Sequence, residues 1–249
     1  MVIRKRKRPS QRRRSAAGSS QALDSPRPPH GASEESWDPK PATTREKLVE
    51  AARQLFLVKG YEATGIAEIL REAGVNSGSL YYFFKTKEEL LLAVLDLYVA
   101  MLHPAVTDPV FSKVGDPIER VFAVLNGYRQ MLIITSCRQG CPIGNLALEM
   151  SEKSEAAREK IALNFRNWRK AIEQCLRDAA DRFPRETDFE AMGIFILTVM
   201  EGAVMQARAH RSLEPFDASV KVLRDYVDRM TAQRGRVSSN ESQDAPSGG

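Results

Sequence analysis

The chain has 249 residues, of which 43% are hydrophobic and 28% charged, and this composition excludes a protein that is disordered throughout. The net charge is +5, but the first fourteen residues hold eight basic side chains and no acidic one. Subtracting these eight leaves −3 for the rest of the chain. Total charge therefore does not supply a nucleic-acid-binding face in the folded part, and any such face depends on where charges are placed.

Several classes of protein are disfavoured by what the sequence lacks. Cys137, Cys141 and Cys175 are too few and too poorly spaced for a disulfide scaffold, and the three histidines lie far apart, so we expect neither a structural metal nor a cofactor. We find no phosphate-binding glycine loop, nucleophile elbow or histidine-centred cluster, which argues against an enzyme. No uninterrupted apolar run is long enough to span a bilayer, and no apolar signal stretch follows the arginine-rich start. We expect a cytoplasmic protein without a membrane partner.

Residues 1–42 are rich in Arg, Ser, Pro and Gly, which predicts a disordered basic tail. The basic stretch from Arg4 to Arg14 has two interpretations. It can act as an arm that contacts phosphates or enters a minor groove, or it can be a solvated tail without a role. The sequence leaves both open.

Between the tails nearly every segment has helical periodicity, and this predicts an all-α fold of about nine helices. The first helix opens at Thr43 or Thr44 and ends at Gly60. Its buried stripe follows the helical spacing i, i+3, i+4, i+7 and i+8: Leu48, Ala51, Ala52, Leu55 and Phe56.

Two short helices joined by a glycine-containing turn come next, which is typical of a helix-turn-helix unit. Thr64 is expected to cap the first of them, and Asn76 or Ser77 the second. Gly74 in the turn permits a backbone conformation that a Cβ would oppose.

Leu80 and Phe84 are four residues apart and are expected to anchor the second short helix to the core. Its N-terminal half is then free to enter a major groove. The predicted DNA contacts are Thr64, Asn76, Ser77, Gly78, Ser79, Tyr81, Tyr82 and Lys85. A buried aromatic cluster is the alternative for residues 81–84, but consecutive helical residues point in different directions, so at least two must face outward. We expect Tyr81 to contact DNA and Phe83 to lie in the core.

Three motifs carry a family resemblance: Phe56-x3-Gly60-Tyr61-x2-Thr64, Ile69-x3-Ala73-Gly74-Val75, and the run from Gly78 to Leu90. With them, residues 44–94 resemble the DNA-binding domain of the TetR/AcrR family. The resemblance implies a homodimer, an operator with two-fold character and a variable C-terminal domain of about six helices. Ser77 stands where many members have lysine, and Tyr82-Phe83 where many have a His-His pair, so the base preference does not transfer.

Six further helices are expected at about 87–102, 117–135, 145–150, 154–182, 188–212 and 218–230. Pro104 is expected to close the first of them. The predicted organisation is a basic tail over 1–42, a DNA-binding domain over 43–90, a ligand-binding and dimerisation domain over 91–232, and a disordered tail over 233–249.

The segment 140–150, together with Glu201-Gly202-Ala203, resembles a branch of the family related to acrylate-responsive and multidrug-type repressors. The resemblance implies a ligand cavity among the middle helices. The candidate ligand contacts are Met101, Phe122, Leu125, Asn145, Met150, Phe165 and Trp168. Ordinary core packing is the alternative for each. Trp168 and Asn145 are the better candidates, because an indole ring and a buried amide both require a polar partner.

The apolar stripe of the helix over 188–212 is too wide for burial on one side only, so we expect it to pair with its symmetry mate, together with the final helix. The predicted dimer contacts are Ile196, Met200, Ala203, Val204, Ala207, Leu223 and Val227. Cys137 and Cys141 have two interpretations: a thiol that reacts with electrophiles, helped by nearby Arg138, or an inert small hydrophobic residue.

Together these features predict a ligand-responsive DNA-binding repressor that binds a palindromic operator as a homodimer and is released by a small-molecule inducer. The expected mechanism is a movement of the helix over 87–102 that changes the separation of the two recognition helices. The alternative is a non-specific or architectural DNA-binding protein that uses the basic tail and has no inducer.

Overall fold

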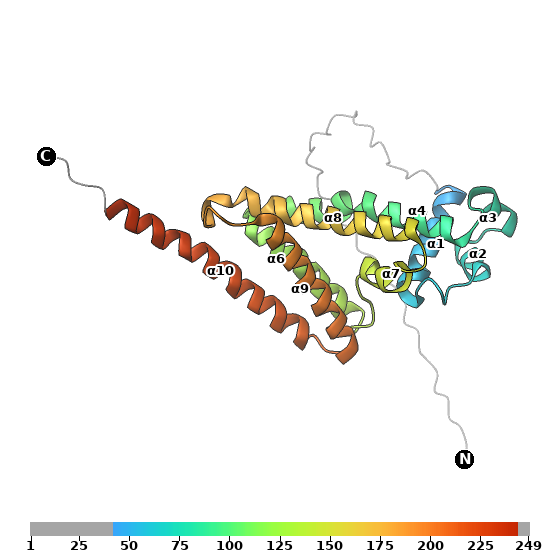
Figure 1. The fold of residues 1–249 in the computed structure, drawn as a ribbon. Helices are drawn as coiled ribbons and strands as arrows, with labels where there is room; N and C mark the ends of the chain where they lie inside the picture. Colours follow the sequence, from blue (N-terminus) through green and yellow to red (C-terminus); the bar gives the residue numbers. More distant parts are fainter. Residues whose placement is uncertain (1–41, 244–249) are drawn as a thin grey trace, which may run out of the picture. The chain divides into compact units, whose positions relative to one another are not determined.

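The computed structural model describes residues 42–243, and the side chains of residues 42–232. Every regular element in this part of the chain is helical, which confirms the all-α prediction (Figure 1). Residues 1–41 and 244–249 lie outside the described residues, and with them lies the basic stretch from Arg4 to Arg14. The described residues belong to one compact unit.

Nine helices of the described chain correspond to the predicted ones. They are α1 (Thr44–Lys59), α2 (Ile66–Ala73), α3 (Ser77–Phe83), α4 (Lys87–Met101), α6 (Pro117–Ile134), α7 (Pro142–Met150), α8 (Glu155–Asp178), α9 (Phe189–His210) and α10 (Glu214–Gln243). Three short elements add to them: the π-helix η1 (Leu102–Thr107), the four-residue α5 (Asp108–Phe111) and the 3-10 helix η2 (Ala180–Arg182).

Side-chain caps fix the starts of several helices. At α1, the Thr43 hydroxyl accepts the Glu46 amide at 3.2 Å while the Glu46 carboxylate accepts the Thr43 amide at 2.7 Å, which forms a capping box. Asp116 caps α6, Ser154 caps α8 and Asp188 caps α9, each by accepting a backbone N–H of the first turn. The predicted starts of these helices are confirmed.

Other boundaries differ from the prediction. The helix does not close at Pro104, because the chain passes through the wider π turns of η1 into α5, and proline has no N–H to contribute to a regular turn. α7 begins at Pro142 rather than Asn145, since proline suits the first helical position. α10 extends to Gln243, past the predicted boundary at residue 233, and no proline interrupts the chain there.

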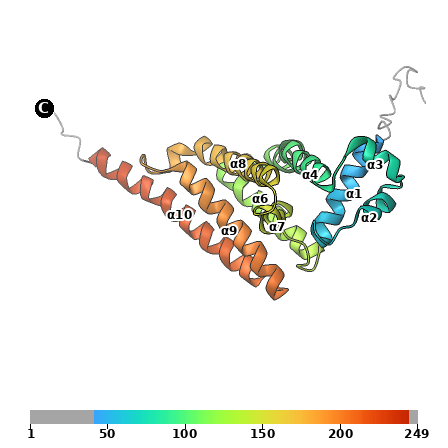
Figure 2. The ribbon, with the colours of Figure 1, turned by 45° about the vertical axis from the view of Figure 1, so that its right-hand side comes forward.

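The buried apolar side chains form two cores. The first joins α1–α4 with α7 and the first half of α8, and it includes Leu48, Leu90, Leu146 and Ile161. The second joins α6, the rest of α8, α9 and α10. α4 and α8 lie side by side in Figures 1 and 2, and the buried Asn164 amide of α8 donates to the Leu95 carbonyl at 3.1 Å. The predicted domain boundary at residue 90 therefore does not separate two cores, because α7 and α8 complete the core of the helix-turn-helix.

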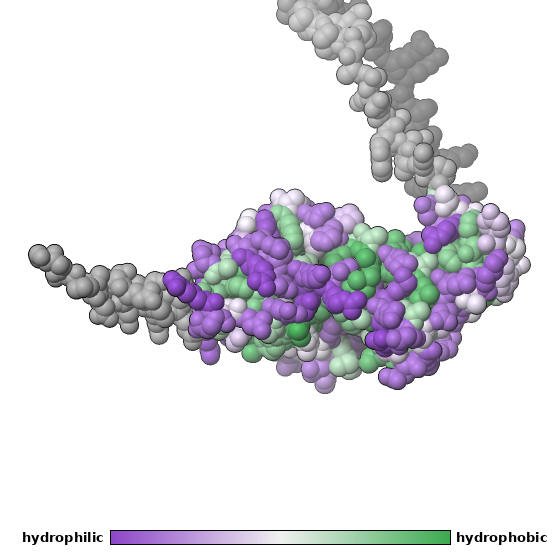
Figure 3. Space-filling model, turned by 45° about the horizontal axis from the view of Figure 1, so that its top comes forward, coloured by the Kyte–Doolittle hydropathy of each residue, from purple (hydrophilic) through white to green (hydrophobic). Residues whose placement is uncertain are grey.

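Two helical segments, Lys87–Phe111 and Phe189–His210, have the length and composition of a membrane-crossing helix. Both contain charged residues, so neither is an uninterrupted apolar run. In the fold, α4 supplies the first core and α9 the second. The face drawn in Figure 3 is largely hydrophilic, with smaller hydrophobic patches between. Packing within the two cores accounts for part of the apolar composition of both segments, since 39% of each is buried.

Candidate functional site

The outer face of α3 carries exposed aromatic side chains. Leu80 and Phe84 are buried and anchor this element as predicted, whereas Tyr81 is 52% and Tyr82 77% exposed. Phe83, which was predicted to lie in the core, is 38% exposed and packs edge-on against Tyr82, with ring centroids 4.8 Å apart. The reason is that α3 ends at Phe83, and the extended backbone at Phe84 turns that ring inward instead.

The turn before α3 is built as the sequence indicates. Gly74 adopts the left-handed conformation, with φ +64°. Asn76 caps α3, and its Oδ1 accepts the Ser79 amide at 2.9 Å and the Ser79 hydroxyl at 3.1 Å. Ser77 and Gly78 stay exposed at the helix N-terminus, where backbone N–H groups attract anions. Asn76 therefore fixes the first turn of α3 through its side-chain oxygen.

Basic side chains flank the exposed face of α3. The Lys85 ammonium donates to the Tyr81 carbonyl at 2.8 Å, and the Arg45 guanidinium lies 5.3 Å from the centroid of the Phe84 ring. Within the described residues, no carboxylate forms an ion pair with either. Thr64, also predicted to contact DNA, is buried, and its hydroxyl donates to the Gly60 carbonyl at 2.7 Å. The N-cap of α2 is Gly65, so Thr64 does not cap α2 and instead bonds to the preceding turn.

A carboxylate of α7 binds the turn between α1 and α2. The amides of Tyr61 and Glu62 donate to the two Glu149 oxygens at 2.8 and 2.6 Å. Gly60 has φ +89°, and a Cβ there would lie 3.0 Å from Glu149 Oε2. Lys153 adds an ion pair to Glu62 at 2.7 Å. Sequence reasoning missed this contact, because nothing in the local pattern pairs residues so far apart in the chain.

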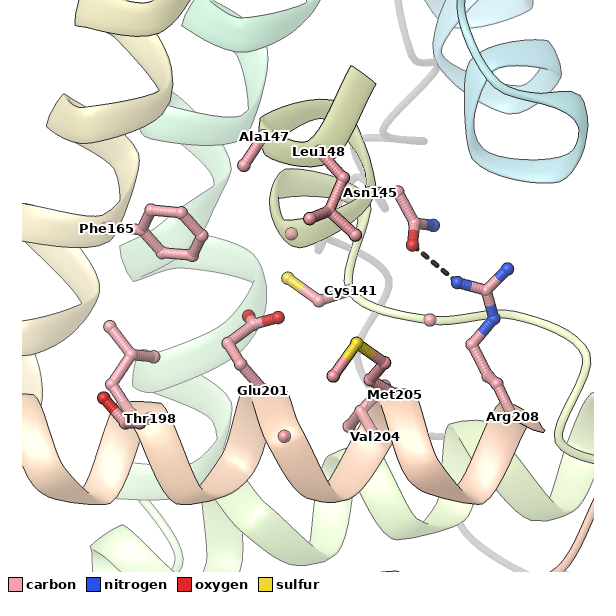
Figure 4. Close-up of a pocket in the computed structure, with 14 residues that line it drawn as sticks. Cys141, Asn145, Ala147, Leu148, Phe165, Thr198, Glu201, Val204, Met205 and Arg208 are labelled. Atoms are coloured by element: carbon pink, nitrogen blue, oxygen red, sulfur yellow. Dashed lines mark hydrogen bonds between the residues drawn. The ribbon is translucent and has the colours of Figure 1, made fainter. Parts of the chain in front are cut away.

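The same helix α7 lines a cavity of about 460 Å³ between α7, α8 and α9 (Figure 4). We call it the Glu201 pocket. Its lining includes Cys141, Asn145, Phe165, Thr198, Glu201, Met205 and Arg208. At one end, Arg208 of α9 donates to the Asn145 side-chain oxygen at 2.6 Å, as the dashed line in Figure 4 marks. The walls between the polar ends are mostly apolar.

At the other end of the pocket, Glu201 and Cys141 line the cavity, and the phenol of Tyr128 lies behind Cys141 in the lining of a neighbouring cavity. The Glu201 carboxyl group lies beside Cys141, and its Oε1 is buried without a hydrogen-bond partner in the described structure. Burial raises the pKa of Glu201. The Tyr128 hydroxyl donates to Cys141 Sγ at 3.8 Å. Burial, followed by the nearby Glu201 charge, raises the pKa of Cys141, so this residue is a protonated thiol at neutral pH.

Comparison with known proteins accounts for both parts of the architecture. Residues 48–94 match the family of bacterial regulatory proteins, tetR family. Residues 117–222 match the C-terminal domain of LmrA/YxaF-like transcriptional regulators. The chain belongs to the TetR family of helix-turn-helix transcriptional regulators. The family predicted from the motifs around α3 is therefore confirmed.

Relatives of this TetR-family regulator match most of its length. The transcriptional repressor DhaR of Mycobacterium sp. (strain GP1) is 28% identical over 72% of this chain and 89% of its own. The transcriptional regulator LmrA of Bacillus subtilis is 29% identical over 69% of this chain and 90% of its own. The crystal structure of E. coli NemR in its reduced form aligns with a TM-score of 0.66 and 26% identity, over 74% of this chain and 96% of NemR.

The structure separates the seven candidate ligand contacts of the regulator. Asn145 and Phe165 line the Glu201 pocket. Trp168 lines a second cavity of about 410 Å³, the Trp168 pocket, next to η1, α5 and α6. The remaining four line neither of these two cavities: Met101, Phe122, Leu125 and Met150. The centroid of the Phe122 ring lies 3.4 Å from the guanidinium carbon of Arg224. Leu125 belongs to the second core and Met150 to the first.

The residues predicted for the dimer interface are buried inside a single chain. All seven belong to the second core: Ile196, Met200, Ala203, Val204, Ala207, Leu223 and Val227. The stripe of α9 chosen from the sequence faces α6, α8 and α10 in the single chain, so its assignment to the dimer interface stays a prediction. Other large apolar side chains of α9 and α10 are exposed: Ile194, Phe195, Met205, Val222 and Tyr226. Three of them, Phe195, Val222 and Tyr226, line one groove between the two helices, and we call this surface the outer face.

We expect all three cysteines of the regulator to react slowly with alkylating reagents. Cys137, Cys141 and Cys175 are buried, and burial raises the pKa of Cys141 and Cys175, so the reactive thiolate is scarce. Timed labelling with iodoacetamide at pH 8, read by mass spectrometry, should be at least about tenfold slower in the native protein than in urea. Rapid labelling of Cys141 in the native protein, or an altered response to peroxide in a Cys141→Ser variant, would instead support the interpretation that this thiol reacts with electrophiles.

Proposed function

We propose that this TetR-family regulator is a cytoplasmic repressor that binds a palindromic operator as a homodimer and leaves it when a small molecule fills the Glu201 pocket. The observation that carries the proposal is that one helix, α7, contacts both the pocket and the DNA-binding domain. α7 lines the pocket through Asn145, and through Glu149 it binds the backbone of the turn that leads into the helix-turn-helix. A ligand that displaces α7 thereby changes the position of that turn.

On the DNA side, we propose that the N-terminal half of α3 enters the major groove. Ser77, Gly78 and Ser79 let the backbone approach a phosphate, while Tyr81 and Tyr82 present hydroxyl groups to phosphates or base edges. Lys85 supplies positive charge at the end of the helix. The buried Thr64 and the capping Asn76 keep a structural role in this proposal.

The homodimer is proposed to form through the outer face. The Phe195 and Tyr226 rings pack together across α9 and α10 with centroids 5.7 Å apart, and a shallow groove runs between the two helices. At Gly202 nothing lies within 4 Å of an added Cβ, so a second helix has room to approach. Two-fold pairing of this face would present two copies of α3 to half-sites about 34–36 Å apart.

The mechanism proposed is a shift of population between a DNA-binding form and a released form. Filling the Glu201 pocket favours the form in which α7 has moved, and the ligand must bind that form more tightly than the other. α7 then moves the turn at Tyr61, and α8 moves α4 through the bond from Asn164 to Leu95. The Trp168 pocket, next to η1 at the end of α4, is the second candidate location for an inducer.

Selection of bound sequences from random DNA by the full-length protein tests the DNA part of the proposal. We expect a short palindrome, protected in a footprint, and release of the protein by a fraction of a metabolite library. Binding without sequence preference and without any releasing compound would support the alternative, an architectural protein that uses its basic tail.

We expect Glu149→Gln to loosen the turn that α7 holds. The variant keeps the shape of the side chain but replaces a charged acceptor of two amides, and hydrogen bonds to charged groups contribute about 1.5–3 kcal/mol each. Hydrogen exchange of the Tyr61 and Glu62 amides should accelerate by at least about tenfold, while exchange in α9 stays as it is. Glu152→Gln, an exposed glutamate nearby, is the matched control. If both amides exchange in Glu149→Gln as slowly as in the wild type, Glu149 does not hold this turn.

A further inference from the structure

The Glu201 pocket separates two opposite charges along one helix face. Glu201 and Arg208 are seven residues apart on α9, which places them two turns apart on the same side, about 10 Å along the axis. Arg208 is engaged with the Asn145 side chain at 2.6 Å. Glu201 has no such partner for its Oε1. The unsatisfied group is therefore at the acidic end of the pocket.

The surroundings of Glu201 supply no positive charge. Its neighbours are the protonated thiol of Cys141, the phenol of Tyr128 and the hydroxyl of Thr198, which already donates to the Ile194 carbonyl at 2.9 Å. No lysine, arginine or histidine of the described residues forms an ion pair with Glu201. On the α7 side, Gly144 leaves room for the carboxylate, since an added Cβ would collide with Glu201 Oε2. A buried acid oxygen without a partner is costly unless a bound group satisfies it.

We propose that the ligand of the Glu201 pocket is an organic cation, with a protonated nitrogen against the Glu201 carboxylate and an apolar body along Phe165 and Met205. This inference rests on the proposed function, because it names the class of inducer for the same pocket. Burial destabilises the charged form of the carboxylate, and a bound cation would stabilise that form again, whereas a neutral donor offers only a weaker hydrogen bond. The ring of Phe165 faces the space beside Glu201 in Figure 4 and provides an aromatic wall.

The size of the cavity fits the proposal. Small-molecule pockets commonly enclose about 300–1,000 Å³, and the Glu201 pocket measures about 460 Å³, enough for a bicyclic aromatic amine. At its far end, Arg208 and Asn145 suit a hydrogen-bond acceptor on the same molecule. An anion held by Arg208 alone would leave the Glu201 oxygen unsatisfied, so this alternative explains less of the site.

Three matched fluorescent probes distinguish these ligand classes. The full-length protein is titrated at pH 7.5, without DNA, with 1-naphthylmethylammonium, the neutral 1-naphthylmethanol and the anionic 1-naphthylacetate. We expect the cation to bind at least about tenfold more tightly than the alcohol. In Glu201→Gln the cation should lose that advantage while alcohol binding stays the same. Glu190→Gln, which removes an exposed carboxylate elsewhere on α9, should behave like the wild type.

A second variant covers the case in which Glu201→Gln fails to fold. Gly144→Ala retains the charge but pushes the carboxylate away from its position, so it should also weaken binding of the cation. Equal affinity for the three probes, tighter binding of the anion, or cation affinity unchanged in a folded Glu201→Gln would overturn the proposal. Since the titration contains no DNA, these results leave the operator experiment intact, and a missing palindrome would instead refute the proposed function.

Discussion

Replacing both Tyr81 and Lys85 with alanine is expected to lower operator affinity by about 100-fold or more, because each DNA contact contributes about 1–3 kcal/mol and the dimer loses both contacts twice. Tyr81 is half exposed and Lys85 lies against its carbonyl, so neither substitution opens a cavity in the core. The melting temperature should therefore stay within the range of the wild type. Fluorescence anisotropy with the selected operator measures the loss.

Lys113→Ala provides the charge control for this experiment, since Lys113 is exposed on the loop after α5. It should bind the operator as the wild type does, with the same dependence on salt. The double variant should in addition show a shallower salt dependence, because a phosphate contact is lost. Undiminished operator affinity in a folded double variant would mean that α3 does not read DNA through this face.

The combination Phe195→Glu and Tyr226→Glu is expected to convert the regulator to a monomer and to reduce operator affinity by about 100-fold or more, since a monomer engages one half-site only. Buried unpaired carboxylates facing their symmetry mates would be desolvated and would repel one another. Both positions are about half-exposed in the single chain and lie outside the two cores, so the fold itself should survive. Sedimentation equilibrium gives the oligomeric state.

Val58→Glu is the matched control, because it places the same charge on an exposed apolar position of α1, away from the outer face. Ile196→Glu gives a further contrast: Ile196 is buried in the second core, so this variant should unfold the chain rather than release folded monomers. Persistence of the dimer in the Phe195 and Tyr226 double variant would direct the search for the interface to another surface.

The helix-turn-helix could be predicted closely from the sequence because its determinants are local. The glycine in the turn, the caps and the spacing of Leu80 and Phe84 each act over a few residues. The differences from the prediction arose where the sequence pattern left the end of a helix or its cap uncertain by one residue. α3 ends one residue earlier than the aromatic run does, which exposes Phe83, and the cap of α2 moves from Thr64 to Gly65.

The pocket and the interface depended on which helix faces which, and periodicity does not encode this. α9 is apolar on nearly all sides, so its sequence indicates burial but not a direction. Glu201 belongs to this helix, yet its value as a candidate comes from neighbours on α6 and α7. The resemblance to the family placed a cavity among the middle helices, and only the packing identified its lining.

The contact between Glu149 and the turn at residues 61–62 has a consequence for engineering. The carboxylate accepts hydrogen bonds from two main-chain amides, so these bonds do not depend on the side chains of residues 61 and 62, provided that residue 60 is glycine. The ion pair between Lys153 and Glu62 is an additional contact that does depend on a side chain. We expect chimeras that join the DNA-binding domain of another regulator to this ligand-binding domain to remain responsive to the inducer when glycine is kept at position 60 and glutamate at position 149. They should become unresponsive when either residue is exchanged.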